Sequence, residues 1–245
     1  MFDAHLHIIA PGFPLTANQG WLPDFFTADD YLARVQALGV TGGAVVSGSF
    51  QGFDQSYLLA ALDRLGAGFV GVTQLPADTT DAHILALDAA GVRALRFNLQ
   101  RGGSEDVSEL ETMARRVHAL CGWHVELYVA NRHLAALRPT LARLPAVSID
   151  HLGLTADGFD DLVRLVECGV RVKATGFGRC DFDVAHALRT LHTANPAALM
   201  FGTDLPCTRA PRPFDAGDLD LLRETLGADA PALLTRNARA LYRTG

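Results

Sequence analysis

Histidine and aspartate residues stand where three short apolar runs of this chain end. The segment FDAHLH places His5 and His7 two residues apart, VSIDHLG contains Asp150 and His151, and FGTDLP contains Asp204. Imidazole and carboxylate groups hold divalent metal ions, and they also transfer protons near neutral pH. The sequence is therefore compatible with two kinds of site, a metal centre and a metal-free acid–base site. The simpler interpretation is that these are hydrogen-bonded core residues.

Polar side chains in other apolar runs suit an anionic substrate. Arg96 lies in ALRFNL, and a buried arginine needs an anion, for which the carboxylate of a substrate matches its planar fork. Tyr128 ends HVELYV as a candidate hydrogen-bond donor. The remaining candidates are Ser49, Arg101 and Arg179, together with Lys173 and Cys207, for which a structural role is the simpler interpretation.

Eight apolar or β-branched runs alternate with helical patterns and must position these groups. The runs interpreted as strands are FDAHLH, GGAVVSGS, FVGVTQ, ALRFNL, HVELYV, VSIDHL, VRVKAT and LMFGTD. Several helical patterns between them open on Thr, Ser or Asp and close on Gly, as helix ends do. This alternation predicts parallel βαβ units, and eight units predict one domain over residues 1–245, an α/β fold of the (β/α)8 TIM barrel type. The alternative is a doubly wound open sheet.

The active site of such a barrel lies at the C-terminal ends of the strands, where the candidate residues collect. Residues two apart share a face of a strand. We therefore expect His5 and His7 to point into the barrel, with Ala4 and Leu6 facing the helices. The same alternation places Tyr128 on the inner face.

Composition limits the class of protein. A hydrophobic content of 49% supports a large core, and a net charge of −6 without a basic patch argues against nucleic-acid binding. No apolar run approaches the ~18 residues of a membrane span. The four cysteines form no CxxC pair, and no signal peptide is visible, so we expect free thiols. These features predict a soluble cytoplasmic protein with a small-molecule partner; the sequence leaves the oligomeric state open.

Taken in order, the motifs resemble the amidohydrolase superfamily. Within it they are most similar to the amidohydrolase-related branch that contains 2-pyrone-4,6-dicarboxylate hydrolase and related lactonases. The supporting stretches are FTADDYLARVQALGV, VVSGSFQGFDQSYL, GVRALRFNLQR, GWHVELYV, SIDHLG, VKATGFGR and MFGTDLP. The resemblance implies hydrolysis of a lactone ring in a small carboxylated or sugar-acid substrate.

The resemblance also implies roles for individual residues. Asp204 matches the general base, and Tyr128 and His151 match groups near the substrate carbonyl. His5 and His7 match the histidine pair of the first strand. The substrate-binding positions correspond to Ser49, Arg96 and Arg179, and to Arg101 if its loop shifts by one residue. The pyrone-dicarboxylate hydrolases have a tyrosine at the position of Leu15, and they have the sequence TDWPH where this chain has TDLPC. These differences separate the chain from the pyrone-dicarboxylate hydrolases and leave a related, less charged lactone open.

The residues on the fourth and fifth strands argue against a binuclear metal centre. A binuclear centre of this superfamily needs a bridging lysine on the fourth strand, where the chain offers Arg96, and a histidine on the fifth, where it offers Tyr128. A single zinc ion held by His5, His7 and Asp204 remains an alternative, with His151 or water as fourth ligand. We expect that no cofactor is required.

The mechanism expected from the sequence is attack of water on the lactone carbonyl, with Asp204 as the base. This requires that the pocket tune the pKa of Asp204 towards the working pH. Two other functions stay open. One is a zinc-dependent decarboxylase of the same superfamily, and the other is a barrel without catalytic activity.

Overall fold

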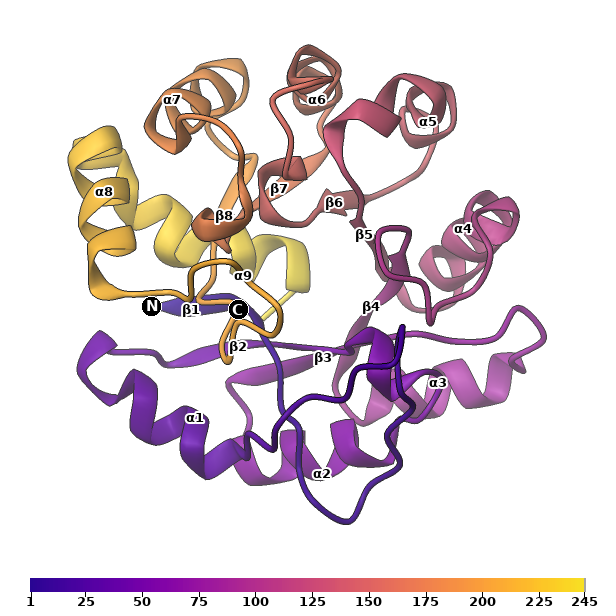
Figure 1. Ribbon diagram of the computed structural model, residues 1–245. Coiled ribbons are helices and arrows are strands. Elements are labelled where there is room, and N and C mark those ends of the chain that lie inside the picture. Colours follow the sequence, from indigo (N-terminus) through magenta and orange to yellow (C-terminus); the bar gives the residue numbers. More distant parts are fainter. Residues whose placement is uncertain (245) are drawn as a thin grey trace.

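The computed structural model describes residues 1–244 and contains eight parallel strands surrounded by helices (Figure 1). The strands are β1 Phe2–Leu6, β2 Gly42–Val46, β3 Phe69–Thr73, β4 Val92–Asn98, β5 His124–Tyr128, β6 Val147–Ile149, β7 Arg171–Ala174 and β8 Leu199–Phe201. The helices are α1 Ala28–Val35, α2 Ser56–Leu65, α3 Asp81–Ala89, α4 Leu110–Cys121, α5 Leu134–Leu141, α6 Phe159–Glu167, α7 Val184–Ala194, α8 Ala216–Leu226 and α9 Asn237–Tyr242. Each strand pairs with the next in sequence order, so the predicted (β/α)8 barrel is confirmed and the doubly wound sheet is wrong.

Local sequence explains where several helices begin and end. The Thr27 side chain accepts a hydrogen bond from the backbone N–H of Asp30, whose carboxylate returns to the backbone of Thr27, so α1 starts with a capping box. Gly122 ends α4 in a left-handed conformation with φ +69°. No helix in residues 1–244 has the length and apolar character needed to cross a membrane.

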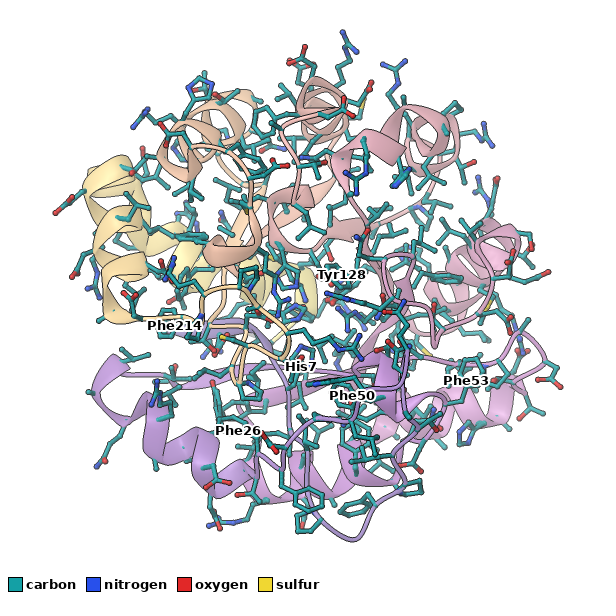
Figure 2. All side chains as sticks on the ribbon, in the orientation of Figure 1. His7, Phe26, Phe50, Phe53, Tyr128 and Phe214 are labelled. Atoms are coloured by element: carbon teal, nitrogen blue, oxygen red, sulfur yellow. The ribbon has the colours of Figure 1, made fainter. Side chains whose placement is uncertain are left out.

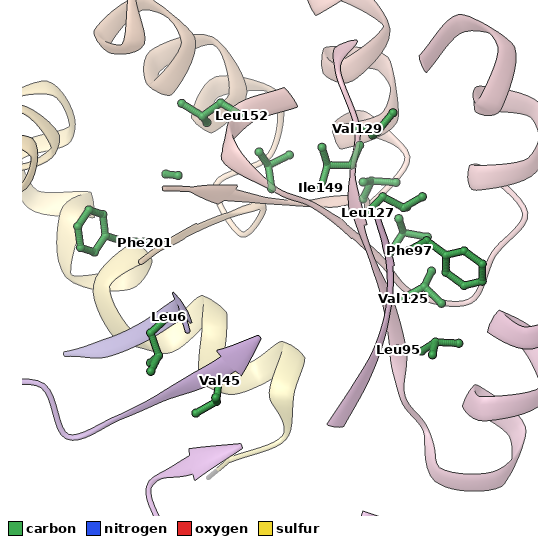
Figure 3. Packing of buried hydrophobic residues seen from close by; sticks show 14 of the residues in the cluster. Leu6, Val45, Leu95, Phe97, Val125, Leu127, Val129, Ile149, Leu152 and Phe201 are labelled. Atoms are coloured by element: carbon green, nitrogen blue, oxygen red, sulfur yellow. The ribbon is translucent and has the colours of Figure 1, made fainter. Parts of the chain in front are cut away.

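The apolar core lies in two layers. On the outer face of the sheet, side chains such as Leu95, Phe97 and Phe201 point towards the surrounding helices (Figure 3). Inside the barrel, Ala4 packs with Phe2, the alanines and valines of β2 to β4, Met200 and Tyr242. Leu6 belongs to the outer layer as expected, but the expectation that Ala4 faces the helices is wrong. The register of β1 against β2 shifts between Asp3 and Leu6, and this irregularity breaks the two-residue alternation.

Helix α9 closes the barrel at the N-terminal ends of the strands, and the sequence did not indicate it. It follows a π-helical turn at Ala232–Arg236 and contacts β1 and β8. The Tyr242 ring stacks on Phe2 at 5.6 Å between ring centroids, and its hydroxyl donates to the buried Glu126 carboxylate. The C-terminal helix is therefore part of the interior that supports the opposite end of the barrel.

The two ends of the strand order, β1 and β8, are joined by individual hydrogen bonds. The backbone N–H of Asp204 donates to the carbonyl of His5 at 2.8 Å, and that of His7 donates to Leu205 at 2.8 Å. The buried Asp3 carboxylate accepts from the Thr203 N–H at 2.8 Å and the Thr203 hydroxyl at 2.7 Å. It also accepts from the Tyr31 hydroxyl of α1 at 2.9 Å. Asp3 thus fixes the residue directly before Asp204.

Replacing Asp3 with alanine should destabilise the fold by about 3–5 kcal/mol, because it leaves several buried donors without an acceptor at about 1–3 kcal/mol each. Urea unfolding measures this change. Asp24 is exposed and serves as the matched control, since its replacement by alanine should alter the free energy of unfolding by less than about 0.5 kcal/mol. Equal stabilities for the two variants would contradict the role given to Asp3.

Candidate active site

A pocket opens at the C-terminal ends of the strands. Three of its lining residues, His7, Phe50 and Tyr128, are labelled in Figure 2. The lining residues are His7, Trp21, Gly48, Ser49, Phe50, Arg96, Asn98, Arg101, Tyr128, His151, Arg179, Asp204, Thr208 and Arg209. The cavity itself is small, about 40 Å³, within a recess of about 380 Å³ that includes open solvent.

Asp204 forms the centre of this site. Three histidines direct Nε2 atoms at its Oδ1 atom, with separations of 3.9 Å for His5, 3.7 Å for His7 and 3.9 Å for His151. The other carboxylate oxygen, Oδ2, accepts a hydrogen bond of 2.8 Å from Nε of Arg179. Asp204 itself has φ +61°, a strained backbone conformation that directs its side chain into the pocket. The structure therefore places His5, His7 and His151 around Asp204, at the end of the barrel where strand direction predicts that they collect.

Hydrogen bonds to the Nδ1 atoms orient two of these imidazoles. Nδ1 of His7 lies 2.7 Å from the carbonyl oxygen of Val46, which only accepts, so Nδ1 holds the proton and neutral His7 presents a lone pair at Nε2. Nδ1 of His151 lies 2.8 Å from the Thr175 hydroxyl, which donates or accepts. Both rings are thus held on the pocket side by groups on neighbouring strands.

Burial keeps His5 and His151 neutral near pH 7. It lowers the pKa of His5 to about 4 against the attraction of Asp150, and it lowers the pKa of His151 well below its usual range against the attraction of Asp204. These two histidines therefore act through hydrogen bonds or lone pairs and add no positive charge near pH 7.

The groups around Asp204 fit one divalent ion. His5 Nε2 and Asp204 Oδ1 are buried and have no hydrogen-bond partner, and the lone pair of His7 Nε2 faces the same carboxylate oxygen. The His7 lone pair and the Asp204 carboxylate oxygen are acceptors that face each other, so they need a proton donor or a cation between them. Two imidazole nitrogens and one carboxylate oxygen are also ligands that catalytic zinc uses.

A second metal ion is disfavoured by the positively charged side chains that surround Asp150. This carboxylate belongs to another candidate group, with His5 and His151, but Arg96 Nη2 donates to it at 2.8 Å and Lys173 Nζ lies 3.7 Å away. A cation placed there would be repelled by both side chains. The geometry supports the sequence-based argument against a binuclear centre.

Arg96 and Arg179 line the pocket, but each is already paired with a buried carboxylate. Arg96 also donates to the carbonyl of Ser47, and its guanidinium carbon lies 5.5 Å from the centre of the Tyr128 ring. Arg179 donates from Nε to Asp204 and from Nη2 to the carbonyl of Thr208 at 2.9 Å. The sequence favoured a substrate carboxylate as the partner of Arg96 and left an internal Asp or Glu as the alternative, which is the partner that the structure shows. The pairing of Arg179 with Asp204 was not predicted.

The pairing with Arg179 sets the charge state of Asp204. Burial alone would raise the pKa of this carboxyl group, but the Arg179 guanidinium and the neighbouring histidines hold it well below its usual range. Asp204 is therefore ionised at every working pH and can accept a proton. It is nevertheless a weaker base than the sequence-based mechanism requires, because Arg179 stabilises its charged form.

Ser49 and Arg101 reach the pocket from loops. Ser49 begins a short 3₁₀ helix after β2, and the backbone of Gly103 lies so close to it that a Cβ atom on Gly103 would come within 2.5 Å of the Ser49 carbonyl oxygen. Arg101 follows β4, and Asn98 accepts a hydrogen bond from its backbone N–H at 2.9 Å. Both predicted residues are thus placed at the pocket, while their roles stay predictions.

Two features of the site escaped the sequence analysis. Trp21 and Arg209 line the pocket, although neither lies at the end of a strand. A buried charge network also lies beneath the site, where Lys173 Nζ is 2.5 Å from Glu126 Oε2 and 3.3 Å from His5 Nδ1. Alternation along β5 predicts Glu126 on the inner face of the barrel, but its partner was not predicted, and no sequence signal marks the two loop residues.

The fold and this site define a barrel enzyme with a histidine pair on its first strand and an aspartate after its last. The chain belongs to the amidohydrolase family, whose sequence model matches residues 2–244.

The curated relatives of this chain share about a third of its residues or fewer. The chain is 28% identical over 230 residues to a 4-sulfomuconolactone hydrolase of Hydrogenophaga intermedia, a match that covers 84% of this chain and 74% of the relative. It is 32% identical over 157 residues to a 2-pyrone-4,6-dicarboxylate hydrolase of Comamonas testosteroni, covering 62% and 51% of the two chains. An apo crystal structure of an Agrobacterium tumefaciens protein superimposes with a TM-score of 0.86 at 24% identity and covers 100% of this chain and 96% of that one, which shows a shared fold.

Proposed function

We propose that the protein hydrolyses the lactone ring of a small carboxylated or sugar-acid substrate. The observation that supports this proposal most directly is the convergence of three imidazole Nε2 atoms on Asp204 Oδ1, at 3.7–3.9 Å, in a pocket lined by arginines. The relatives named as hydrolases of sulfomuconolactone and pyrone dicarboxylate support the same reaction class.

In the proposed reaction, a water oxygen attacks the ester carbonyl carbon while Asp204 takes a proton from that water. The carbonyl oxygen becomes an oxyanion, to which the hydroxyl of Tyr128 and Nε2–H of His151 donate. Such prepositioned donors contribute about 3–4 kcal/mol each to stabilisation of the transition state. The ring C–O bond then breaks, and the proton on Asp204 passes to the leaving oxygen. His7 has no donor at Nε2 in its neutral form, so it orients the water instead.

Substrate binding supplies the missing base strength. Arg179 lies at the pocket with its Nη2 and Nε atoms engaged by Thr208 and Asp204. A substrate carboxylate that draws this guanidinium away from Asp204 raises the basicity of the carboxylate when the ester is in place. Ser49 adds a hydrogen bond from the opposite side of the pocket, and Arg96 keeps Tyr128 and Asp150 in position.

A divalent ion held by His5, His7 and Asp204 would polarise the ester carbonyl as a Lewis acid. The donor set fits such an ion, but we propose that turnover does not depend on it, because Tyr128 and His151 already supply the polarising groups. This proposal keeps the expectation drawn from the sequence.

The test is a panel of pyrone carboxylates, muconolactones and sugar-acid lactones, followed with a pH indicator, before and after treatment with a chelator. We expect acid release from at least one lactone at a rate that the chelator leaves unchanged, with less than stoichiometric metal by elemental analysis. Stoichiometric zinc with activity that is lost on chelation and restored by zinc would overturn the metal-free mechanism. Release of CO₂ from a carboxylated substrate without acid production would favour a decarboxylase instead.

A further inference from the structure

The four arginines of the pocket differ in how their charge is balanced. The inner pair is neutralised, since Arg96 lies 2.8 Å from Asp150 and Arg179 lies 2.8 Å from Asp204. The outer pair, Arg101 and Arg209, forms no ion pair with any carboxylate of residues 1–244, although both line the same pocket. The mouth of the pocket therefore holds positive charge that no internal anion balances.

Arg209 is held in place by contacts from the loop that follows β1. Nη2 donates to the carbonyl of Asn18 at 2.8 Å and Nη1 donates to Asn18 Oδ1 at 3.2 Å. The guanidinium carbon stacks over the Trp21 ring at 4.2 Å from its centroid, and the Asn18 amide donates to the carbonyl of Arg101 at 3.0 Å. These contacts orient the arginine before any ligand arrives, which lowers the entropy cost of binding.

The held guanidinium still has donors to offer. Only two of its five N–H groups are engaged, and Nε is buried without a partner. Burial and the neighbouring charge of Arg101 both lower the pKa of Arg209, so an anion between the two arginines would relieve repulsion. Asp181, in the adjoining groove, instead accepts from the N–H of Ala156 at 2.6 Å.

We propose that Arg209, held by Asn18 and Trp21, is a specificity-determining residue that binds a second anionic group of the substrate. The inference rests on the proposed function, because Arg209 would bind this group at the pocket mouth, at the end of the substrate away from the scissile ester. Arg209 therefore selects lactones with two anionic groups, such as two carboxylates, over lactones with one. This differs from the less charged substrate that the departures in sequence suggested.

The test compares wild type with Arg209→Gln on a pyrone dicarboxylate and on the matching pyrone monocarboxylate. The variant should raise KM for the dicarboxylate about 10- to 100-fold, the loss that charged hydrogen bonds produce, and should change KM for the monocarboxylate less than about threefold. Arg209→Lys keeps the charge without the fork and should give an intermediate value. Arg132→Gln removes an exposed arginine outside the pocket and should behave as wild type. Equal changes on both substrates would overturn the proposal.

A binding measurement separates this inference from the proposed function. Benzene-1,3-dicarboxylate has two carboxylates and no ester, and calorimetry should show that it binds wild type at least about tenfold more tightly than Arg209→Gln, while benzoate binds both alike. If no lactone is opened but this difference is found, the lactonase proposal fails and the anion site stands. If lactones are opened and the difference is absent, the anion site fails and the lactonase proposal stands.

Discussion

Replacing Asp204 with asparagine is expected to lower kcat roughly 10²- to 10⁴-fold, the usual contribution of a general base. Asparagine has nearly the same shape as aspartate and tolerates the positive φ of this position, so the backbone should remain in place. Steady-state kinetics on the substrate found in the lactone panel measures the effect, and circular dichroism checks the fold. Substrate affinity should change little, because the proposed anion contacts involve the arginines.

The matched control is Arg179→Gln, which removes the same buried ion pair but leaves the Asp204 carboxylate. If Asp204 acts as the base, this variant should retain a larger kcat than Asp204→Asn and should lose activity mainly through a higher KM. A kcat for Asp204→Asn within about tenfold of wild type would contradict the assignment.

Replacing Lys173 with methionine is expected to destabilise the protein by about 3–5 kcal/mol, because it leaves a buried carboxylate without its countercharge. Lys173 and Glu126 are both fully buried, and Nζ lies 2.5 Å from Oε2. Burial raises the pKa of Glu126, but Lys173 and His124 outweigh it and lower the pKa to about 2. The pair therefore contributes stability above the ordinary glutamate pKa of about 4.3, which is lost as the pH falls towards 2.

The double variant Lys173→Met, Glu126→Gln removes both charges and keeps an acceptor for the Tyr242 hydroxyl. It should recover most of the lost free energy of unfolding, since exchanging a whole buried pair is often nearly neutral. Urea unfolding of both variants at pH 7 measures the difference. A double variant no more stable than the single one would show that Lys173 acts through another contact, such as His5 at 3.3 Å.

Much of the fold was predictable because its signals are local. Each strand is a short apolar run and each helix has its own pattern and caps, so eight repeats in order specify a barrel. Helix α9 was missed because Asn237–Tyr242 is short and its stability comes from contacts of Tyr242 inside the barrel, which no local pattern reveals. The register irregularity in β1 likewise reversed the orientation expected for Ala4.

The sequence by itself determined the barrel, the collection of His5, His7, His151 and Asp204 at one end of it, and the argument against two metal ions. The first two follow from residue type and from strand direction, because parallel strands bring their C-terminal ends to one rim, and the third also rests on the resemblance to the amidohydrolase superfamily. Only the tertiary structure decided which charges meet. Arg179 pairs with Asp204, and Arg209 lies against Asn18, 191 residues away along the chain. Such contacts depend on loop conformations and on the balance between burial and charge, which are properties of the folded chain as a whole.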